Sequence, residues 1–157
     1  MRDKRSLVDQ VARLMAELQD AVQLLDESAA AQLGLNLTDL RCVRQIVQEG
    51  PQSPSELARS TGLTRAAISA ALDRLEAANV ARRVADPYDR RRTLVEPTGH
   101  ARVAIAQIWS PIETEGRREL ARYTAAELAV IVDFIAKSID LQRKHISRLL
   151  DAVSSRA

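Results

Sequence analysis

The stretch from Ser53 to Thr98 constrains the fold of this 157-residue chain most, because its turn signals fall at the spacing of two short, tightly connected helices. It opens with Ser53-Pro54-Ser55-Glu56, a capping box in which Ser53 accepts from the third helical amide and Glu56 bonds back. Pro54 suits the first helical position, where its missing amide costs nothing. The pattern predicts a helix from Pro54 to near Gly62, a residue that readily adopts the positive φ of a tight turn.

A second helix is expected over residues 65–78, with Thr64 as its N-cap. Ile68, Leu72 and Leu75 recur at helical spacing and are predicted to face the core. The opposite face carries mostly short side chains, so that this helix fits a major groove about 12 Å wide. The residues predicted on that outer face are Arg65, Ala66, Ser69, Ala70 and Asp73.

A β-hairpin is predicted after this helix, with Asn79 as a left-handed cap between them. Residues 80–84 alternate as a strand, residues 93–96 read as its partner, and residues 86–92 form the loop. Three consecutive arginines, Arg90 to Arg92, lie in that loop. Taken alone they fit a solvated charged turn, but beside a helix-turn-helix they favour contact with DNA phosphate or a narrow minor groove.

Several motifs in this stretch resemble those of the multiple-antibiotic-resistance regulator (MarR) family of winged helix-turn-helix transcription factors. They are Leu63-Thr64-Arg65, Leu72-Asp73-Arg74-Leu75-Glu76, Asp86-Pro87-Tyr88-Asp89-Arg90-Arg91 and the Thr98 that opens the next helix. The order and length of the remaining predicted helices extend the resemblance, more weakly, over nearly the whole chain. The match departs at Asn79, where a glycine is usual, at Pro97, where a leucine is usual, and at Gly99 directly after the threonine.

The resemblance implies which residues meet DNA. In that family the wing aspartate braces an arginine that enters the minor groove, which corresponds to Asp89 and Arg91. Arg65 and Ser69 are expected to reach base edges, since arginine can bridge guanine O6 and N7, whereas the alanines offer only methyl contacts. Arg74 has two open roles, a phosphate contact or a pair with Glu76 or Asp73. The predicted DNA-binding residues are Thr64, Arg65, Ala66, Ser69, Ala70, Arg74, Asp89, Arg90 and Arg91.

Long helices are predicted on both sides of this lobe. Residues 5–31 carry an apolar stripe from Leu7 to Leu25, and Thr38 is expected to cap a following helix that turns Leu40, Val43, Ile46 and Val47 inward before Gly50-Pro51. A long helix from Thr98 contains Pro111, which predicts a kink or a break near Ser110. A second capping box at Thr124-Ala125-Ala126-Glu127 starts the last helix, which runs to about Val153 with an apolar face from Leu128.

The terminal stripes are too extensive to remain exposed to water, which predicts a homodimer. The alternative for the first stripe is an ordinary core face within one subunit. The expected fold is mainly α with a small β-hairpin wing. We expect a single domain over residues 1–157, with a winged helix-turn-helix lobe at 36–98 and a helical dimerisation region at 1–33 and 99–157.

Composition limits the other function classes. The formal net charge is only +2, so the distribution of charge matters more than its sum, and five arginines, Arg82, Arg83 and Arg90 to Arg92, fall within one hairpin. A lone cysteine and two histidines predict no disulfide, metal site or cofactor, and no motif of an enzyme is found. The N-terminus lacks an apolar signal core and the chain lacks an apolar run of membrane-spanning length, which predicts a cytoplasmic protein without membrane contact.

The leading interpretation is a homodimeric transcriptional regulator that reads a pseudo-palindromic operator in double-stranded DNA, a repressor by resemblance. By resemblance too, a small-molecule effector would bind between the dimer helices and the DNA-binding lobe, with Leu14, Leu18, Cys42 and Trp109 as candidate wall residues. Cys42 is read as either a buried, inert thiol or a redox sensor activated by Arg41 and Arg44. The alternative function is an architectural or protein-interaction module that binds DNA without sequence choice.

Overall fold

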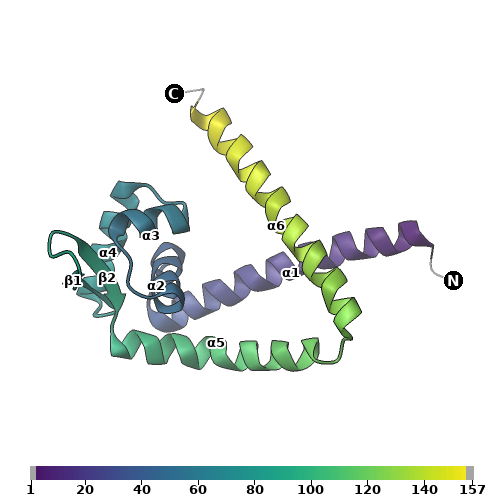
Figure 1. Cartoon of the computed structure of the whole chain (residues 1–157), viewed down its shortest axis with the longest axis horizontal. Helices are drawn as coiled ribbons and strands as arrows, with labels where there is room; N and C mark the ends of the chain where they lie inside the picture. Colours follow the sequence, from purple (N-terminus) through teal and green to yellow (C-terminus); the bar gives the residue numbers. More distant parts are fainter. Residues whose placement is uncertain (1–2, 155–157) are drawn as a thin grey trace. The chain divides into compact units, whose positions relative to one another are not determined.

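The computed structural model describes residues 3–154, without the side chains of residues 150 and 152–154, and is shown in Figure 1. The chain divides into two compact units, Met1–Trp109 and Ser110–Ala157. The first unit holds α1 (Lys4–Leu33), α2 (Leu37–Glu49), α3 (Pro54–Thr61), α4 (Arg65–Ala77), β1 (Ala81–Ala85) and β2 (Thr93–Pro97). Helix α5 (Gly99–Leu120) passes from the first unit into the second, and α6 (Ala125–Ser154) completes the chain. The predicted class, mainly α with a hairpin wing, is confirmed.

The helix-turn-helix forms where its sequence signals predict it. Ser53 accepts from the Glu56 amide, and the Glu56 carboxylate accepts from the Ser53 amide, so the capping box of α3 is complete. Gly62 ends α3 with a φ of +69°, and Thr64 caps α4 by accepting from the Ala67 amide at 3.2 Å. Asn79 follows α4 with a φ of +54°, which confirms its left-handed conformation.

Helix α2 begins earlier than predicted. Its N-cap is Asn36 rather than Thr38, because the Asn36 side chain accepts from the Asp39 amide at 2.9 Å and also donates to the Asp39 carboxylate. This double contact with one residue outweighs the single bond that a threonine cap offers. Upstream, Gly34 ends α1 with a φ of +65°, a left-handed conformation that glycine adopts at little cost.

The core of the first unit is mainly aliphatic, and it joins α2, α3, α4 and the wing to the end of α1 and the first half of α5. The antiparallel pairing of β1 with β2 runs from Ala81 opposite Pro97 to Ala85 opposite Thr93, and a bridge between Gln52 and Val95 ties β2 to the segment before α3. The predicted inward residues of α2 and α4 are buried, except that Val47 is half-buried against the core. The largest fully buried side chains are Leu40, Cys42, Val43, Ile46, Leu57, Ile68, Leu72, Leu75 and Val95.

Helix α5 runs without a break through Pro111. Of the two outcomes predicted near Ser110, a kink or a break, the break is therefore wrong. A proline removes one helical amide bond, that to the carbonyl four residues earlier, while the rest of the ladder can continue. Ala101, Ile105 and Trp109 are buried on the first half of the helix, and the Thr114 hydroxyl donates to the Ser110 carbonyl at 2.7 Å. The half of α5 before Pro111 thus packs against the core of the first unit, and the helix continues unbroken after the proline.

The predicted apolar stripes of α1 and α6 remain exposed within the single chain. On α1, the exposed fractions of Leu7, Val11, Leu14 and Leu18 lie between 42% and 56%, so this stripe is not a core face of the first unit. On α6, Ile135, Ile139, Ile146 and Leu149 are exposed by 45% to 60%, and none of its described side chains is buried. The side chains of Leu150 and Val153, also expected on that face, lie outside the described residues.

Candidate nucleic-acid interface

Helix α4 separates a buried face from an exposed one. Ile68, Leu72 and Leu75 are at most 1% exposed and anchor the helix in the core. The side chains predicted to face DNA lie on the other side, because a 3.6-residue period places them opposite this triplet. Thr64, Arg65, Ala66, Ser69 and Ala70 are all exposed.

Arg74 has a partner that the sequence did not indicate. Its Nε donates to Asp39 Oδ2 at 2.9 Å and its Nη2 donates to Asp39 Oδ1 at 2.6 Å. The Asp39 side chain is 4% exposed, whereas the Arg74 side chain remains 49% exposed. The hydrogen bond to Asp39, reinforced by its negative charge, raises the pKa of Arg74. Of the two roles left open for Arg74, the pair with Glu76 or Asp73 is therefore wrong, and the phosphate contact stays a prediction.

Those two carboxylates instead hold Arg83 of β1. The Arg83 guanidinium donates to Asp73 at 2.8 Å and also pairs with Glu76, whose carboxylate accepts from the Arg83 amide at 2.9 Å. The hydrogen bond to Asp73, more than the charge of Glu76, raises the pKa of Arg83. These contacts link α4, the candidate recognition helix, to β1 at the base of the wing. Asp73 and Arg83 are ten positions apart, and they meet because the hairpin folds back onto α4.

The wing loop is ordered by its own aspartates. Asp86 is 7% exposed, and its Oδ1 accepts from the Tyr88 amide at 2.8 Å and the Asp89 amide at 3.4 Å. Asp89 Oδ1 accepts from the backbone amide of Arg91 at 3.0 Å. Within residues 3–154 the Asp89 carboxylate forms no ion pair with the Arg91 guanidinium, so the expected brace is not formed and Asp89 acts on the backbone of Arg91 instead.

The arginines near this face fall into two groups. Arg92 pairs with Glu56 at 3.3 Å and lies 3.9 Å from Asp86, and Arg82 pairs with Glu96. Arg65, Arg90 and Arg91 are exposed and form no ion pair within residues 3–154. The free cations therefore lie at the start of the recognition helix and at the wing, where a polyanion can reach them.

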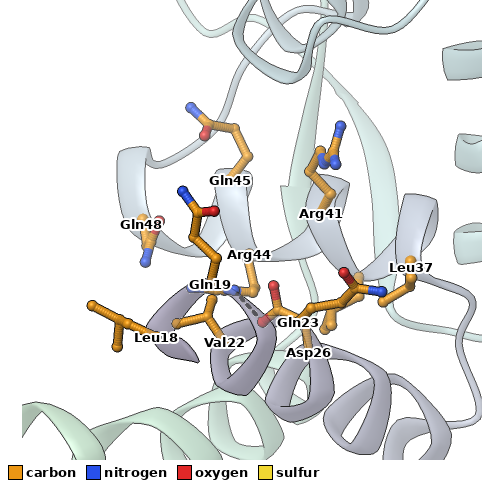
Figure 2. A pocket seen from close by; sticks show the side chains of 11 residues that line it. Leu18, Gln19, Val22, Gln23, Asp26, Leu37, Arg41, Arg44, Gln45 and Gln48 are labelled. Atoms are coloured by element: carbon orange, nitrogen blue, oxygen red, sulfur yellow. Dashed lines mark hydrogen bonds and ion pairs between the residues drawn. The ribbon is translucent and has the colours of Figure 1, made fainter. Parts of the chain in front are cut away.

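A groove of about 670 Å³ lies between α1 and α2, and Figure 2 shows the polar side chains that line it. Of the four residues predicted for an effector site, Leu18 lines this groove, Leu14 is exposed elsewhere on α1, and Cys42 and Trp109 are buried. Arg44, one of the lining residues, pairs with Asp26 at 2.7 Å, and its guanidinium lies 4.4 Å from the centre of the Trp109 ring. The other residues that line the groove, none of them a candidate for the effector site from the sequence, are Gln19, Val22, Gln23, Asp26, Leu37, Leu40, Arg41, Arg44, Gln45 and Gln48.

Cys42 is fully buried. Burial, and then the negative charge of Asp39, raise the pKa of its thiol to about 11, although the Arg41 charge acts in the opposite direction. This outcome agrees with an inert thiol and not with an activated sensor. Within the described residues there is no cluster of metal-ligating side chains, and no helix there is long and apolar enough to cross a membrane.

Comparison with known proteins gives a consistent family. Residues 33–92 match the family model described as MarR family. The chain is 34% identical over 150 residues to the HTH-type transcriptional regulator YcgE of Bacillus subtilis (strain 168), covering 94% of this chain and 97% of that protein.

Two solved structures share the fold at low identity. A mutant MarR from E. coli complexed with operator DNA is 21% identical with a TM-score of 0.56, and the match covers 87% of this chain and 98% of that chain. NadR in complex with 4-hydroxyphenylacetate is 16% identical with a TM-score of 0.60, and the match covers 81% and 90%. The match to the family model and the 34% identity to YcgE over nearly the whole chain show that the chain belongs to the MarR family of DNA-binding transcriptional regulators, a non-enzymatic family.

Proposed function

We propose that the protein is a homodimeric repressor that recognises a pseudo-palindromic operator in double-stranded DNA and releases it when a small molecule binds. The observation that carries the DNA-binding part is the division of the arginines. Arg74, Arg83 and Arg92 are held by carboxylates, whereas Arg65, Arg90 and Arg91 are free on one recognition helix and one wing. A mutant MarR of the same fold is known in complex with operator DNA, which supports the same use of this fold here.

The recognition helix supplies the sequence choice in this proposal. Arg65 and Ser69 lie one turn apart on the exposed face of α4 and reach base edges in the major groove. Ala66 and Ala70 add methyl contacts with thymine, and the Thr64 hydroxyl lies at the helix start, where phosphates are favoured. Arg74 contributes through its ion pair with Asp39, which fixes the helix on its support.

A dimer gives the proposed operator its symmetry. The exposed stripes of α1 and α6 each present a long row of aliphatic side chains, which a second copy of the chain would cover. Two recognition helices related by a twofold axis then read half-sites about one helical turn apart. A monomer at micromolar concentration in a sedimentation experiment would contradict this assembly.

The groove between α1 and α2 is the proposed effector site. It combines apolar side chains such as Leu18 and Val22 with glutamines and two arginines, a mixture that suits a small polar organic ligand. NadR, which has the same fold, is known in complex with 4-hydroxyphenylacetate, and this supports a ligand of comparable size. The sole tryptophan, Trp109, does not line the groove, but its ring lies 4.4 Å from Arg44, which does, so its fluorescence should report ligand binding through Arg44.

Selection of binding sites from random DNA, followed by competition with random duplex at physiological salt, tests the DNA-binding proposal. A specific regulator prefers its selected sequence by about 10³ or more, and the selected sites should be pseudo-palindromes. Equal affinity for all duplexes would favour the architectural alternative. For the effector, a library of small organic compounds is screened by Trp109 fluorescence and by release of the selected duplex. A Gln45→Arg variant is the groove-blocked control, because Gln45 lines the groove from α2 and lies outside the apolar stripe of α1.

A further inference from the structure

The wing tip carries an aromatic side chain that the functions above do not use. Tyr88 is 98% exposed, the most exposed of the large hydrophobic side chains in the described chain. A single exposed apolar residue is ordinary on a protein surface, so its exposure alone indicates nothing. The hydrogen bonds of its backbone and the charges of its neighbours are what indicate a binding role for Tyr88.

The backbone of Tyr88 is held in place although its side chain is free. Its amide donates to Asp86 Oδ1 at 2.8 Å, and the buried Asp86 is itself linked through its amide to the Arg92 carbonyl at 3.0 Å. Arg92 in turn pairs with Glu56 at the start of α3. The ring is therefore presented from a loop that is ordered and fastened to the helix-turn-helix, which limits the entropy lost when the ring is immobilised.

The charges around Tyr88 favour one kind of partner. Arg90 and Arg91 follow Tyr88 in the same loop and form no ion pair within residues 3–154. Asp89 lies between them and Tyr88, and its carboxylate accepts from the Arg91 amide, so the two arginines leave this loop with an excess of positive charge. A polyanion with apolar surface between its charges fits this pattern, and the sugar-lined wall of a DNA minor groove is such a surface. Tyrosine suits it, because the ring is apolar and the hydroxyl can remain in water.

We propose that the Tyr88 ring packs on deoxyribose at the wall of the DNA minor groove and contributes a non-electrostatic part of the wing's affinity. The inference rests on the proposed operator binding and adds a contact of different physical character. The arginines neutralise phosphates and release counterions, whereas the ring excludes water from sugar and releases none. The two kinds of contact therefore differ in how they respond to salt.

Three variants on the full-length protein and the selected operator duplex test the contact. Tyr88→Ala is expected to weaken affinity by about 5- to 10-fold, the effect of burying part of an aromatic side chain, with an unchanged slope of log K against log salt. Tyr88→Phe keeps the ring and should bind within about twofold of the parent. Arg91→Ala, the matched comparison, should lower the magnitude of the salt slope by about 1.

Each other result overturns the contact. Equal affinity of Tyr88→Ala and the parent means that the ring touches nothing in the complex. Loss of the same affinity in Tyr88→Phe assigns the effect to the hydroxyl, and a reduced salt slope in Tyr88→Ala assigns it to displaced arginines. If the parent itself shows no preference for any duplex, the proposed operator function has failed, a result distinguishable from these three.

Protection from nitration measures the contact without a mutation. Tyr88 and Tyr123 are the two tyrosines of the chain, exposed by 98% and 49%. With tetranitromethane and peptide mass spectrometry, saturating operator duplex should slow nitration of Tyr88, because the ring that packs on deoxyribose is less accessible to the reagent. The rate at Tyr123, which lies between α5 and α6, should not change. Equal nitration of Tyr88 with and without duplex contradicts the proposal.

Discussion

Arg74 in the recognition helix and Asp39 in α2 form a two-point ion pair, with Nε 2.9 Å from Oδ2 and Nη2 2.6 Å from Oδ1. Asp39 is also the residue whose amide is capped by Asn36, so one buried carboxylate joins the start of α2 to the recognition helix. A planar guanidinium satisfies both carboxylate oxygens at once, which a lysine cannot do. The pair sets the position of α4 on its support.

Removing the Arg74 guanidinium is expected to lower the stability of the fold rather than to remove a contact with DNA. Arg74→Ala leaves the Asp39 carboxylate, 4% exposed, without its counter-charge, and we expect the thermal midpoint to fall by several degrees. Arg74→Lys keeps the positive charge but cannot bond to both carboxylate oxygens, so its thermal midpoint should lie between those of the parent and Arg74→Ala. The slope of log K against log salt should not change. An unchanged midpoint with a salt slope smaller by about 1 would instead make Arg74 a phosphate contact.

Substituting the free arginine on the same helix should have the opposite pattern. Arg65→Ala removes an exposed side chain with no ion pair within residues 3–154, so the thermal midpoint should remain within about a degree of the parent's. We expect a loss of about 1–3 kcal/mol of discrimination at one base position in each half-site, measured with duplexes that vary that position. A uniform loss over all sequences would assign Arg65 to the backbone.

The α3 capping box should make stability depend on acid pH. Hydrogen bonds from the Ser53 hydroxyl and then its amide lower the pKa of Glu56. Because the folded pKa lies below the unfolded one, the stabilisation is present above the ordinary glutamate pKa of about 4.3 and is lost as pH falls through the folded value. Thermal midpoints of the parent and Glu56→Gln, compared from pH 7 to pH 3, should converge at the acid end.

Ser53→Ala provides a second test of the same box, and it should also reduce the acid dependence because the Ser53 hydroxyl donates to the Glu56 carboxylate. Ser53→Ala removes the acceptor for the Glu56 amide, and a lost N-cap costs about 1 kcal/mol in protein stability. This loss should be visible at neutral pH. A parent and Glu56→Gln that keep a constant difference in midpoint down to pH 3 would mean that the carboxylate contributes nothing through its charge.

The features predicted correctly from the sequence are those that local residue chemistry determines. The capping box at Ser53, the positive φ values at Gly62 and Asn79, and the buried triplet of α4 each depend on neighbours within about one turn. The two errors of this kind have local reasons as well. Thr38 and Asn36 both suit an N-cap, and only Asn36 bonds twice to Asp39; Pro111 interrupts one hydrogen bond without ending α5.

The partners of the arginines could not be predicted in the same way. Arg74 and Asp39 are 35 residues apart, and Arg92 and Glu56 are 36 apart, so their pairing depends on tertiary packing. In the sequence, the three wing arginines form one run. The family resemblance singles out Arg91, and the predicted DNA-binding residues include Arg90 and Arg91 but not Arg92. The structure separates Arg92, which is held by carboxylates, from Arg90 and Arg91, and it places the polar groove between helices whose apolar pattern alone was visible.

Cys42 should be chemically silent in the folded protein. With its pKa raised to about 11 against an ordinary value of 9.0, the thiolate fraction near neutral pH is about 100-fold lower, and burial blocks access as well. Alkylation by iodoacetamide at pH 8 should therefore be slow until urea unfolds the chain. Peroxide treatment should leave operator affinity equal in the parent and Cys42→Ala. Release of the duplex by peroxide in the parent alone would restore the redox-sensor interpretation.

The last prediction concerns how Asp89 serves Arg91. The Asp89 carboxylate accepts from the Arg91 amide at 3.0 Å, and the Asp89 carbonyl accepts from the Arg92 amide at 2.8 Å, so Asp89 fixes the turn from which the Arg91 side chain projects. Since the acceptor oxygen matters more than the charge, Asp89→Asn should retain most operator affinity, and Asp89→Ala should reproduce part of the loss seen in Arg91→Ala. None of the three should shift stability by more than about 0.5 kcal/mol, because the loop is exposed.

Charge alone predicts a different order for these variants. Removing a negative group beside a polyanion favours binding in a purely electrostatic wing, so both Asp89→Asn and Asp89→Ala would then bind more tightly than the parent. Duplex affinity and thermal midpoint for the three variants, measured at one fixed salt concentration, separate the two cases. If Asp89→Ala binds more tightly, the ordering role of Asp89 is wrong and its carboxylate only repels DNA. If Asp89→Asn binds like the parent while Asp89→Ala binds more weakly, the hydrogen bond to the Arg91 amide is what the wing needs.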